Sequence, residues 1–132
     1  MIVDTSAWIE YLRATGSRPD RTIAKALASG VALLMPAVVL QEVLQGARSP
    51  EHYMRLQLEL DQLPVFEADD VIELHRRAAL LYARCRWQGL TVRSPIDCVV
   101  AACALEADVP LLARDKDFES IAQIEPLLKL IS

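Results

Sequence analysis

Residues 93–107 read RSPIDCVVAACALEA, and this stretch indicates the fold class of the chain. Pro95 is a typical first residue of a helix, and the segment that continues to Ala107 is almost wholly apolar. A helix with so few polar residues is expected to be buried on most of its sides. Asp97 is the one charged residue before Glu106, and an unpaired carboxylate would be costly to bury there.

The rest of the chain indicates one α/β domain. Its 132 residues suit a single domain, and a hydrophobic fraction of 53% with a mean hydropathy of +0.23 supplies one core. Strand-like and helical segments alternate, and hairpin signals such as Asn-Gly are absent. We therefore expect residues 1–132 to form one α/β domain, with a central parallel sheet covered by helices on both faces.

The expected elements are short. Strands are predicted at 2–3, 31–35, 64–66, 110–113 and 127–131. Helices are predicted at 7–13, 22–29 and 36–46, from 49, from 69 or 70 to Gly89, at 94–107 and at 118–122. Thr5-Ser6 is expected to cap the first helix, after which 16–20 form a loop.

Charge and cysteine content limit the possible function classes. No basic segment precedes the first apolar stretch, so a signal peptide is not expected, and the longest apolar run is too short to span a membrane. The cysteines, odd in number and without metal-binding spacing, are predicted to be reduced packing residues of a cytoplasmic protein: Cys85, Cys98 and Cys103. A net charge of −4 argues against nucleic-acid binding unless several acids hold a cation.

Five acids occupy positions where an active site is expected in such a sheet. Asp4 follows the first strand, Glu42 borders the apolar face of a helix, and Asp97 opens the buried helix. Asp115 and Asp117 follow the predicted strand near the C-terminus. Ligands of parallel sheets gather at the carboxyl ends of the strands, which is where most of these acids are predicted to lie.

Each acid also has an ordinary structural interpretation. Asp4 could cap a helix, Glu42 could be a solvated surface residue, and Asp97 could form a capping box with Ser94. The turn before the last helix accounts for at least one of the two late aspartates. Each interpretation explains the position of one acid, but the capping box does not explain the apolar surroundings of Asp97.

Clustered carboxylates point to a metal-dependent phosphoryl-transfer reaction. They repel one another unless a cation is present, and Mg²⁺ or Mn²⁺ is the hard ion that prefers oxygen ligands. Such an ion activates water and stabilises charge on phosphate oxygens. Other catalytic motifs are missing, including a P-loop and a nucleophile elbow. His52 and His75 are predicted to be helix-surface residues.

Taken together, four segments resemble the PIN-domain family, and within it most closely the VapC toxins. They are IVDTSAW at 2–8, Glu42, RSPIDCVVAA at 93–102 and LLARDKDF at 111–118. The resemblance covers essentially the whole chain. It implies a three-layer α/β/α fold with four to five parallel strands and a Mg²⁺- or Mn²⁺-dependent endoribonuclease. It also implies a toxin of a type II toxin–antitoxin module that inhibits translation by cleaving tRNA or rRNA.

The family's site residues carry over by position. The resemblance implies that the catalytic residues are Asp4, Glu42, Asp97 and Asp115, with Asp4, Asp97 and Asp115 as metal ligands. Ser6 and Asp117 match supporting positions. Ala113 departs from the family, whose members often carry Thr or Ser there, so the polar surroundings of Asp115 differ. The implied partners are a VapB-type antitoxin and RNA, in a homodimer or a toxin–antitoxin hetero-oligomer.

Basic residues near the acids are candidates for binding RNA phosphates. These are Arg86, Arg93, Arg114 and Lys116, and the alternative is a solvated helix face. The sequence is also compatible with three other interpretations. They are a PIN nuclease that processes RNA without an antitoxin, a PIN domain that only binds, and a receiver-type signalling domain.

Overall fold

The computed structural model describes residues 1–132 and contains three strands and seven helices. The strands are β1 (Ile2–Val3), β2 (Leu111–Leu112) and β3 (Leu130–Ile131). The helices are α1 (Thr5–Leu12), α2 (Arg18–Ala28), α3 (Ala37–Gln45), α4 (Pro50–Leu60), α5 (Val71–Trp87), α6 (Pro95–Ala107) and α7 (Asp117–Ile124). None of these helices is both long and apolar enough to cross a membrane.

The three strands form a parallel sheet in the order β1-β2-β3, with Ile2 opposite Leu111. Two single-residue bridges extend this order beyond β1, from Ile2 to Leu34 and from Met35 to Val65. The parallel sheet is therefore confirmed. The predicted strand at 31–35 pairs only through Leu34 and Met35, and the one at 64–66 only through Val65, so three strands form ladders where four to five were expected.

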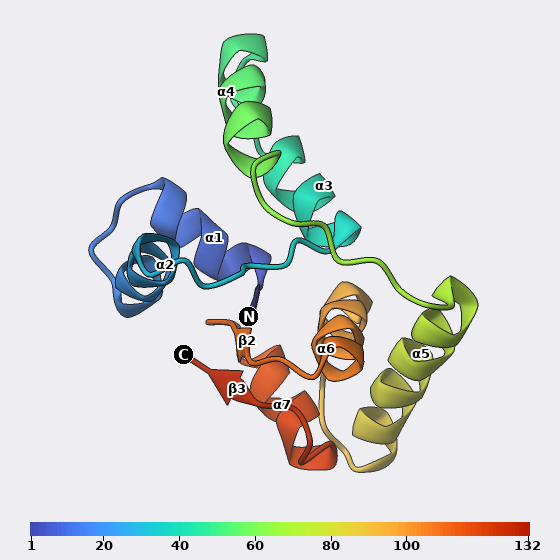
Figure 1. Cartoon of the computed structure of the whole chain (residues 1–132). Helices are drawn as coiled ribbons and strands as arrows, with labels where there is room; N and C mark the ends of the chain where they lie inside the picture. The colour runs from blue at the N-terminus through green and yellow to red at the C-terminus, as the bar shows by residue number, and fades with distance from the viewer.

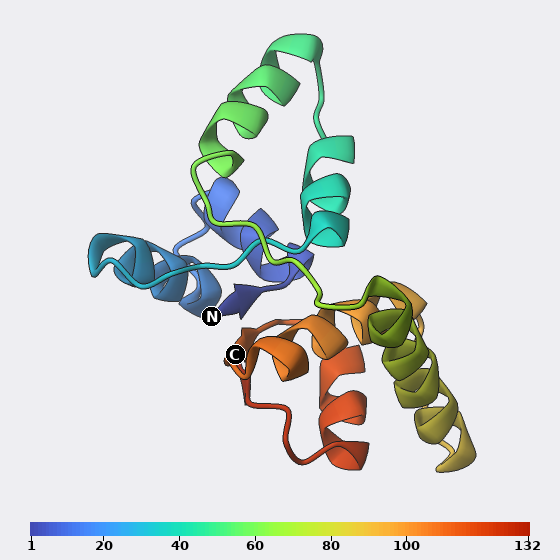
Figure 2. The same ribbon diagram turned by 45° about the vertical axis from the view of Figure 1, so that its right-hand side comes forward.

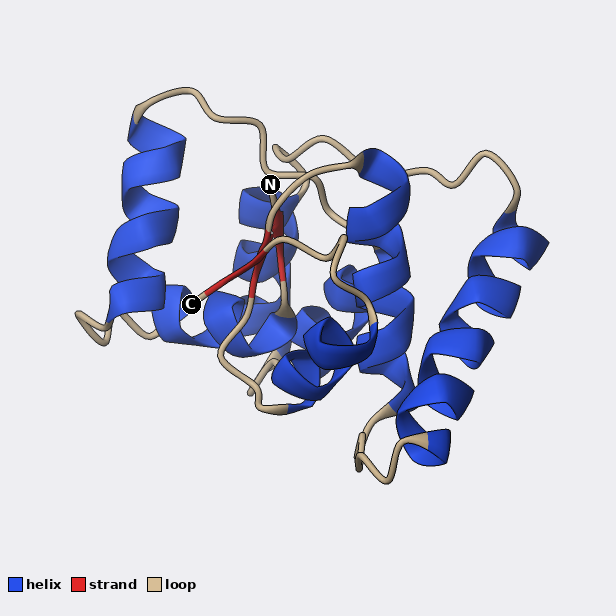
Figure 3. Ribbon diagram, turned by 90° about the horizontal axis from the view of Figure 1, so that it is seen from below, coloured by secondary structure: helices blue, strands red, loops and turns tan.

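Helices lie on both sides of the sheet, which confirms the three-layer arrangement (Figure 1). In that view α1 and α2 lie on one side of the strands, and α6 and α7 lie on the other, with α5 packed outside them. Figure 3, seen from below, shows the strands enclosed by helices. Each side of the sheet is thereby shielded from water, as a parallel sheet requires.

Helices α3 and α4 form a hairpin that projects from the remainder of the fold (Figures 1 and 2). The hairpin stays attached through contacts of α3 with α1 and with α6. Ser49 caps α4 by accepting a hydrogen bond from the backbone N–H of His52, as the sequence predicted for this helix start. Because α3 packs against α1, one face of the hairpin turns toward α1.

The buried core is one continuous cluster of 28 residues, and α6 runs through it. Its buried apolar residues are Cys98, Val100, Ala101, Ala102, Cys103 and Ala104. Small side chains let the neighbouring helices and strands approach α6 closely. All three cysteines are free and buried, as expected for packing residues.

Two predicted helix starts were wrong. Asp4, and not Thr5-Ser6, caps α1, because its carboxylate accepts the backbone N–H of Ser6. Helix α2 begins at Arg18, inside the predicted loop, because Ser17 caps it and Pro19 fits its first turn.

Candidate metal centre

Asp4 lies at the carboxyl end of β1, where it is 3% exposed. Its Oδ2 accepts hydrogen bonds from the backbone N–H of Ser6 at 3.2 Å and from the Ser6 hydroxyl at 2.8 Å. Its Oδ1 is buried without a partner. Burial raises the pKa of Asp4 despite these hydrogen bonds, and the nearby charge of Glu42 adds to the rise.

Asp97 lies in the first turn of α6 and is 7% exposed. Burial raises its pKa to about 8, with further contributions from the charge of Asp4 and from hydrogen bonding to Asp117. Its Oδ2 also has no hydrogen-bond partner. The capping-box interpretation was wrong, since the Ser94 side chain makes no capping hydrogen bond.

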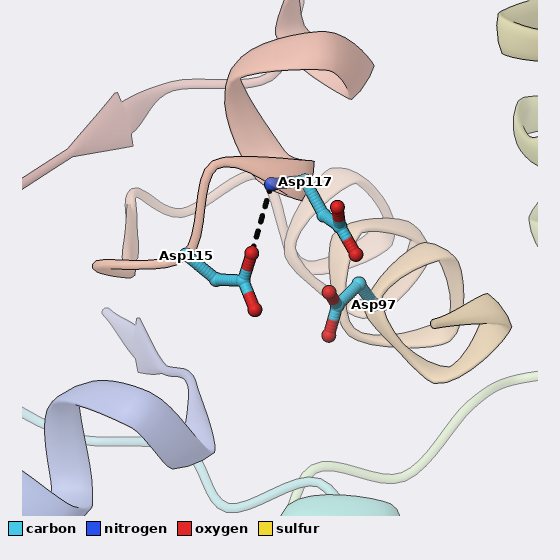
Figure 4. Close-up of side chains that lie close together, drawn as sticks. All are labelled: Asp97, Asp115 and Asp117. Atoms are coloured by element: carbon cyan, nitrogen blue, oxygen red, sulfur yellow. Dashed lines mark hydrogen bonds between the residues drawn. The ribbon is translucent and has the colours of Figure 1, made fainter. Parts of the chain in front are cut away.

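Asp115 and Asp117 come from the turn between β2 and α7, and Figure 4 shows them facing Asp97. One carboxylate oxygen from each of the three aspartates falls within 4.8 Å of the others. Asp115 Oδ1 accepts the backbone N–H of Asp117 at 2.9 Å, so Asp115 closes the turn that starts α7. The structure thus brings together acids that are separated in the sequence.

Asp117 differs from its neighbours because its carboxylate is well supplied with donors. Its Oδ2 accepts the backbone N–H groups of Arg93 and Ser94, at 2.9 and 3.1 Å. Burial raises the pKa of Asp117, but these hydrogen bonds outweigh burial and leave the pKa below its ordinary value. Asp117 therefore fixes the segment that leads into α6.

Glu42 reaches the same region from α3. Its Oε1 accepts a hydrogen bond of 2.7 Å from the Thr5 hydroxyl on α1. No sequence pattern predicts this hydrogen bond, because Thr5 and Glu42 lie 37 positions apart. The Ser6 hydroxyl, in turn, accepts the backbone N–H of Arg114 at 3.2 Å, which joins the ends of β1 and β2.

The predicted RNA-binding residues are placed unevenly. The Arg93 side chain lies 3.8 Å from both Asp115 and Asp117, and Arg114 pairs with Glu10 at 2.8 Å. Lys116 and Arg86 are exposed, and neither forms an ion pair. His75 is exposed on α5 and His52 is half-buried on α4.

These residues suit a hard divalent cation. All the potential ligand atoms are carboxylate oxygens. Two buried ones, Asp4 Oδ1 and Asp97 Oδ2, have no hydrogen-bond partner. A cation would satisfy these atoms and relieve the repulsion that raises the pKa of Asp97. The group within ligand distance contains Asp117, whereas the predicted set had Asp4 in its place, so the exact ligand set stays a prediction.

Comparison with known proteins identifies the class of this fold and site. Residues 1–124 match the PIN domain family. The chain is similar to VapC ribonuclease Mb1587 of Mycobacterium bovis and to Ribonuclease VapC11 of Mycobacterium tuberculosis. Each is 38% identical over 128 residues, which cover 96% of this chain and 95% of the relative. The chain therefore belongs to the PIN domain family and, within it, to the VapC ribonucleases.

Solved structures agree on the fold. VapBC-1 from nontypeable Haemophilus influenzae gives a TM-score of 0.75 at 18% identity, covering 99% of this chain and 96% of that one. VapBC2 from Rickettsia felis, bound to a promoter DNA fragment, gives 0.72 at 18% identity, covering 98% and 96%. The resemblance to PIN-domain VapC proteins inferred from the sequence is confirmed, and the receiver-domain reading was wrong.

Proposed function

We propose that this protein is the toxin of a type II toxin–antitoxin module and cleaves RNA with Mg²⁺ or Mn²⁺ bound at the carboxylate cluster. Residues 1–132 act as one PIN domain in this proposal. The observation that carries it is the pair of buried, unpartnered carboxylate oxygens on Asp4 and Asp97, beside Asp115 and Asp117. A bound cation would let both carboxylates stay ionised while buried.

The proposed ligands are Asp4, Asp97 and Asp115. A bound Mg²⁺ supplies an activated water and neutralises charge on the scissile phosphate. Ser6 orients Asp4 through two hydrogen bonds, so that Oδ1 stays free for a ligand. Asp117 fixes the backbone at 93–94 and thereby the start of α6, where Asp97 lies.

Glu42 is the proposed acceptor of the proton that the attacking water loses. Thr5 holds its Oε1, which leaves the second oxygen to accept that proton. Arg93, on the rim of the cluster, is placed to contact a phosphate. The RNA is proposed to be tRNA or rRNA, by analogy with the toxins that the chain resembles.

The proposed protein partner is a VapB-type antitoxin. The solved structures with the same fold include VapBC complexes, one of them bound to promoter DNA. A net charge of −4 suits a partner with a basic segment. A homodimer or a toxin–antitoxin hetero-oligomer is the proposed assembly, and the cytoplasmic location stays a prediction.

An RNA-cleavage assay tests the function. Purified, antitoxin-free protein is incubated with total RNA and either Mg²⁺, Mn²⁺ or EDTA, alongside the Asp97→Asn variant. The matched control is Asp61→Asn, which changes an exposed acid at the end of α4. Discrete fragments are expected with wild type and the control, and none with EDTA or Asp97→Asn. Absence of cleavage by folded wild type with either ion would contradict the proposal.

A further inference from the structure

A groove of about 350 Å³ lies between α1 and the α3–α4 hairpin. Figures 1 and 2 show α1 beside the base of this hairpin. Glu42 lines the groove and its charge acts on Asp4, so the groove borders the carboxylate site. Its apolar lining includes Ile9 and Leu12 of α1 and Val43 of α3. Its volume lies in the range of sites that hold a small ligand or one nucleotide-sized group.

The polar lining of the groove is mostly basic. Arg13, at the end of α1, and Arg48, between α3 and α4, both line it, as does His52 of α4. Neither guanidinium forms an ion pair or a side-chain hydrogen bond, whereas Arg93 and Arg114 are paired with acids. Two free positive charges therefore face a groove in a chain whose net charge is −4.

Two hydrogen bonds at the start of α4 fix the position of His52. Its Nδ1 accepts the backbone N–H of Arg48 at 3.0 Å, while its own N–H is capped by Ser49. Because Nδ1 is an acceptor, the proton of the neutral ring lies on Nε2. The ring therefore offers one donor, and the same hydrogen bonds fix the Arg48 backbone.

We propose that this groove binds the RNA strand beside the scissile phosphate, with Arg13, Arg48 and His52 contacting phosphate oxygens. The inference rests on the proposed function. Five carboxylates in and beside the cluster repel a polyanion, so positive groups next to the site must offset that repulsion. Bases can lie against Ile9, Leu12 and Val43 while the guanidinium groups hold the phosphates.

An RNA strand suits the groove better than an acidic peptide does, because the groove borders the carboxylate site where RNA is proposed to be cleaved. The scissile phosphate has to lie at the carboxylate cluster, so the adjoining nucleotides leave over a surface that borders the cluster. The groove is such a surface and carries the unpaired positive charge that phosphates require.

The test measures binding without cleavage. A fluorescein-labelled single-stranded RNA of mixed sequence is titrated in EDTA with wild type, Arg13→Gln/Arg48→Gln and the control Arg77→Gln. Arg77 is also exposed and unpaired, but it lies on α5. The double variant is expected to bind roughly tenfold more weakly at low salt. Its slope of log affinity against log salt should be shallower by about 1.4, the value for two lost phosphate contacts on a single strand.

Two results would overturn the proposal. One is RNA affinity and salt slope in the double variant equal to those of Arg77→Gln, with circular dichroism showing all proteins folded. The other is loss of binding to a labelled polyglutamate peptide while RNA affinity is unchanged, which would make the groove a peptide site. If wild type binds RNA tightly through these arginines but cleaves none, the nuclease function is contradicted and the proposal that the groove binds RNA is supported.

Discussion

The first turns of α6 and α7 each carry a buried aspartate, and the two carboxylates behave in opposite ways. Asp97 and Asp117 are 7% and 3% exposed and lie in one cluster. The pKa of Asp97 is raised to about 8, whereas that of Asp117 is lowered. The exposed fractions are similar, but desolvation dominates the pKa of Asp97, whereas at Asp117 it is outweighed.

Desolvation and neighbouring carboxylates raise the pKa of Asp97, and hydrogen-bond donors lower that of Asp117. Two backbone N–H groups point at Asp117 Oδ2, and these favour its ionised form. Asp97 Oδ2 has no donor at all. A carboxylate that the protein itself satisfies acts as a structural brace, while one that it leaves unsatisfied is free to hold a cation. We therefore propose that Asp117 braces the backbone and that Asp97 binds the metal, and each role can be tested by substitution.

The largest expected effect is on activity in Asp97→Asn. Loss of a direct metal ligand should reduce kcat/KM by more than the roughly 100-fold that removal of an outer-shell partner costs. Without metal, thermal stability near neutral pH should be little changed, because a pKa of about 8 keeps Asp97 largely protonated and Asn is close to it in shape. Cleavage rates and melting curves on the same preparations check both parts. A large drop in stability would show that Asp97 is a structural residue.

The second effect concerns stability against pH in the absence of metal. The pKa of Asp97 rises from 3.8 in the unfolded chain to about 8 in the fold, so between these values the folded state binds more protons. Unfolding free energy should therefore fall as pH increases from about 4 to about 8, by an amount on the order of a few kcal/mol.

Denaturant unfolding in EDTA at several pH values measures this trend. Asp97→Asn should flatten it, because the group that titrates is gone. Added Mg²⁺ should restore stability at the alkaline end of the window, since the cation favours the ionised carboxylate. An equally steep trend in the variant would assign the titration to another group.

The third effect is the loss of the brace in Asp117→Ala. Two partly buried backbone donors would lose their acceptor, at a total cost of about 1–3 kcal/mol. Asp117→Asn keeps an acceptor oxygen and should recover most of that stability. Chemical denaturation of the two variants is the measurement. Equal stability of wild type and Asp117→Ala would show that Asp117 does not brace the backbone.

The smallest expected effect is in Thr5→Val, which removes the hydroxyl that holds Glu42. A single hydrogen bond to a charged group contributes about 1.5 kcal/mol or more, so activity should fall roughly tenfold. Thr5→Ser keeps the hydroxyl and should stay close to wild type. The result should appear in kcat with KM little changed, because Glu42 is proposed to act on the attacking water.

Much of the fold could be predicted from local sequence signals. Pro95 and the apolar run after it predicted α6, and Ser49 predicted the start of α4. The strands at 31–35 and 64–66 were harder to predict, since apolar residues show that a segment is buried but do not show how many residues pair. Pairing depends on neighbours that are distant in the sequence.

The sequence indicated that acids would gather in the fold, but not the contacts that each of them makes. Asp97 stood out because a charge is rare in an apolar helix. The contrast between Asp97 and Asp117 depends on backbone N–H groups at 93 and 94, which point at one carboxylate and away from the other. The contact between Thr5 and Glu42 likewise exists only because α1 and α3 pack together. Such contacts are fixed by tertiary structure and leave no local signal.

The pairing of β1 with β2 has a consequence for the order in which the chain folds during synthesis. Ile2 and Val3 form their ladder with Leu111 and Leu112, so the first strand waits for almost the last part of the chain. Asp4 and Asp115, which both act on Asp97, reach the same edge of the sheet only after that ladder forms, because each follows one of these strands. A ribosome-bound fragment that ends before β2 therefore has no complete carboxylate cluster. With the cluster as the proposed catalytic centre, the nascent chain would gain ribonuclease activity only when synthesis is nearly finished.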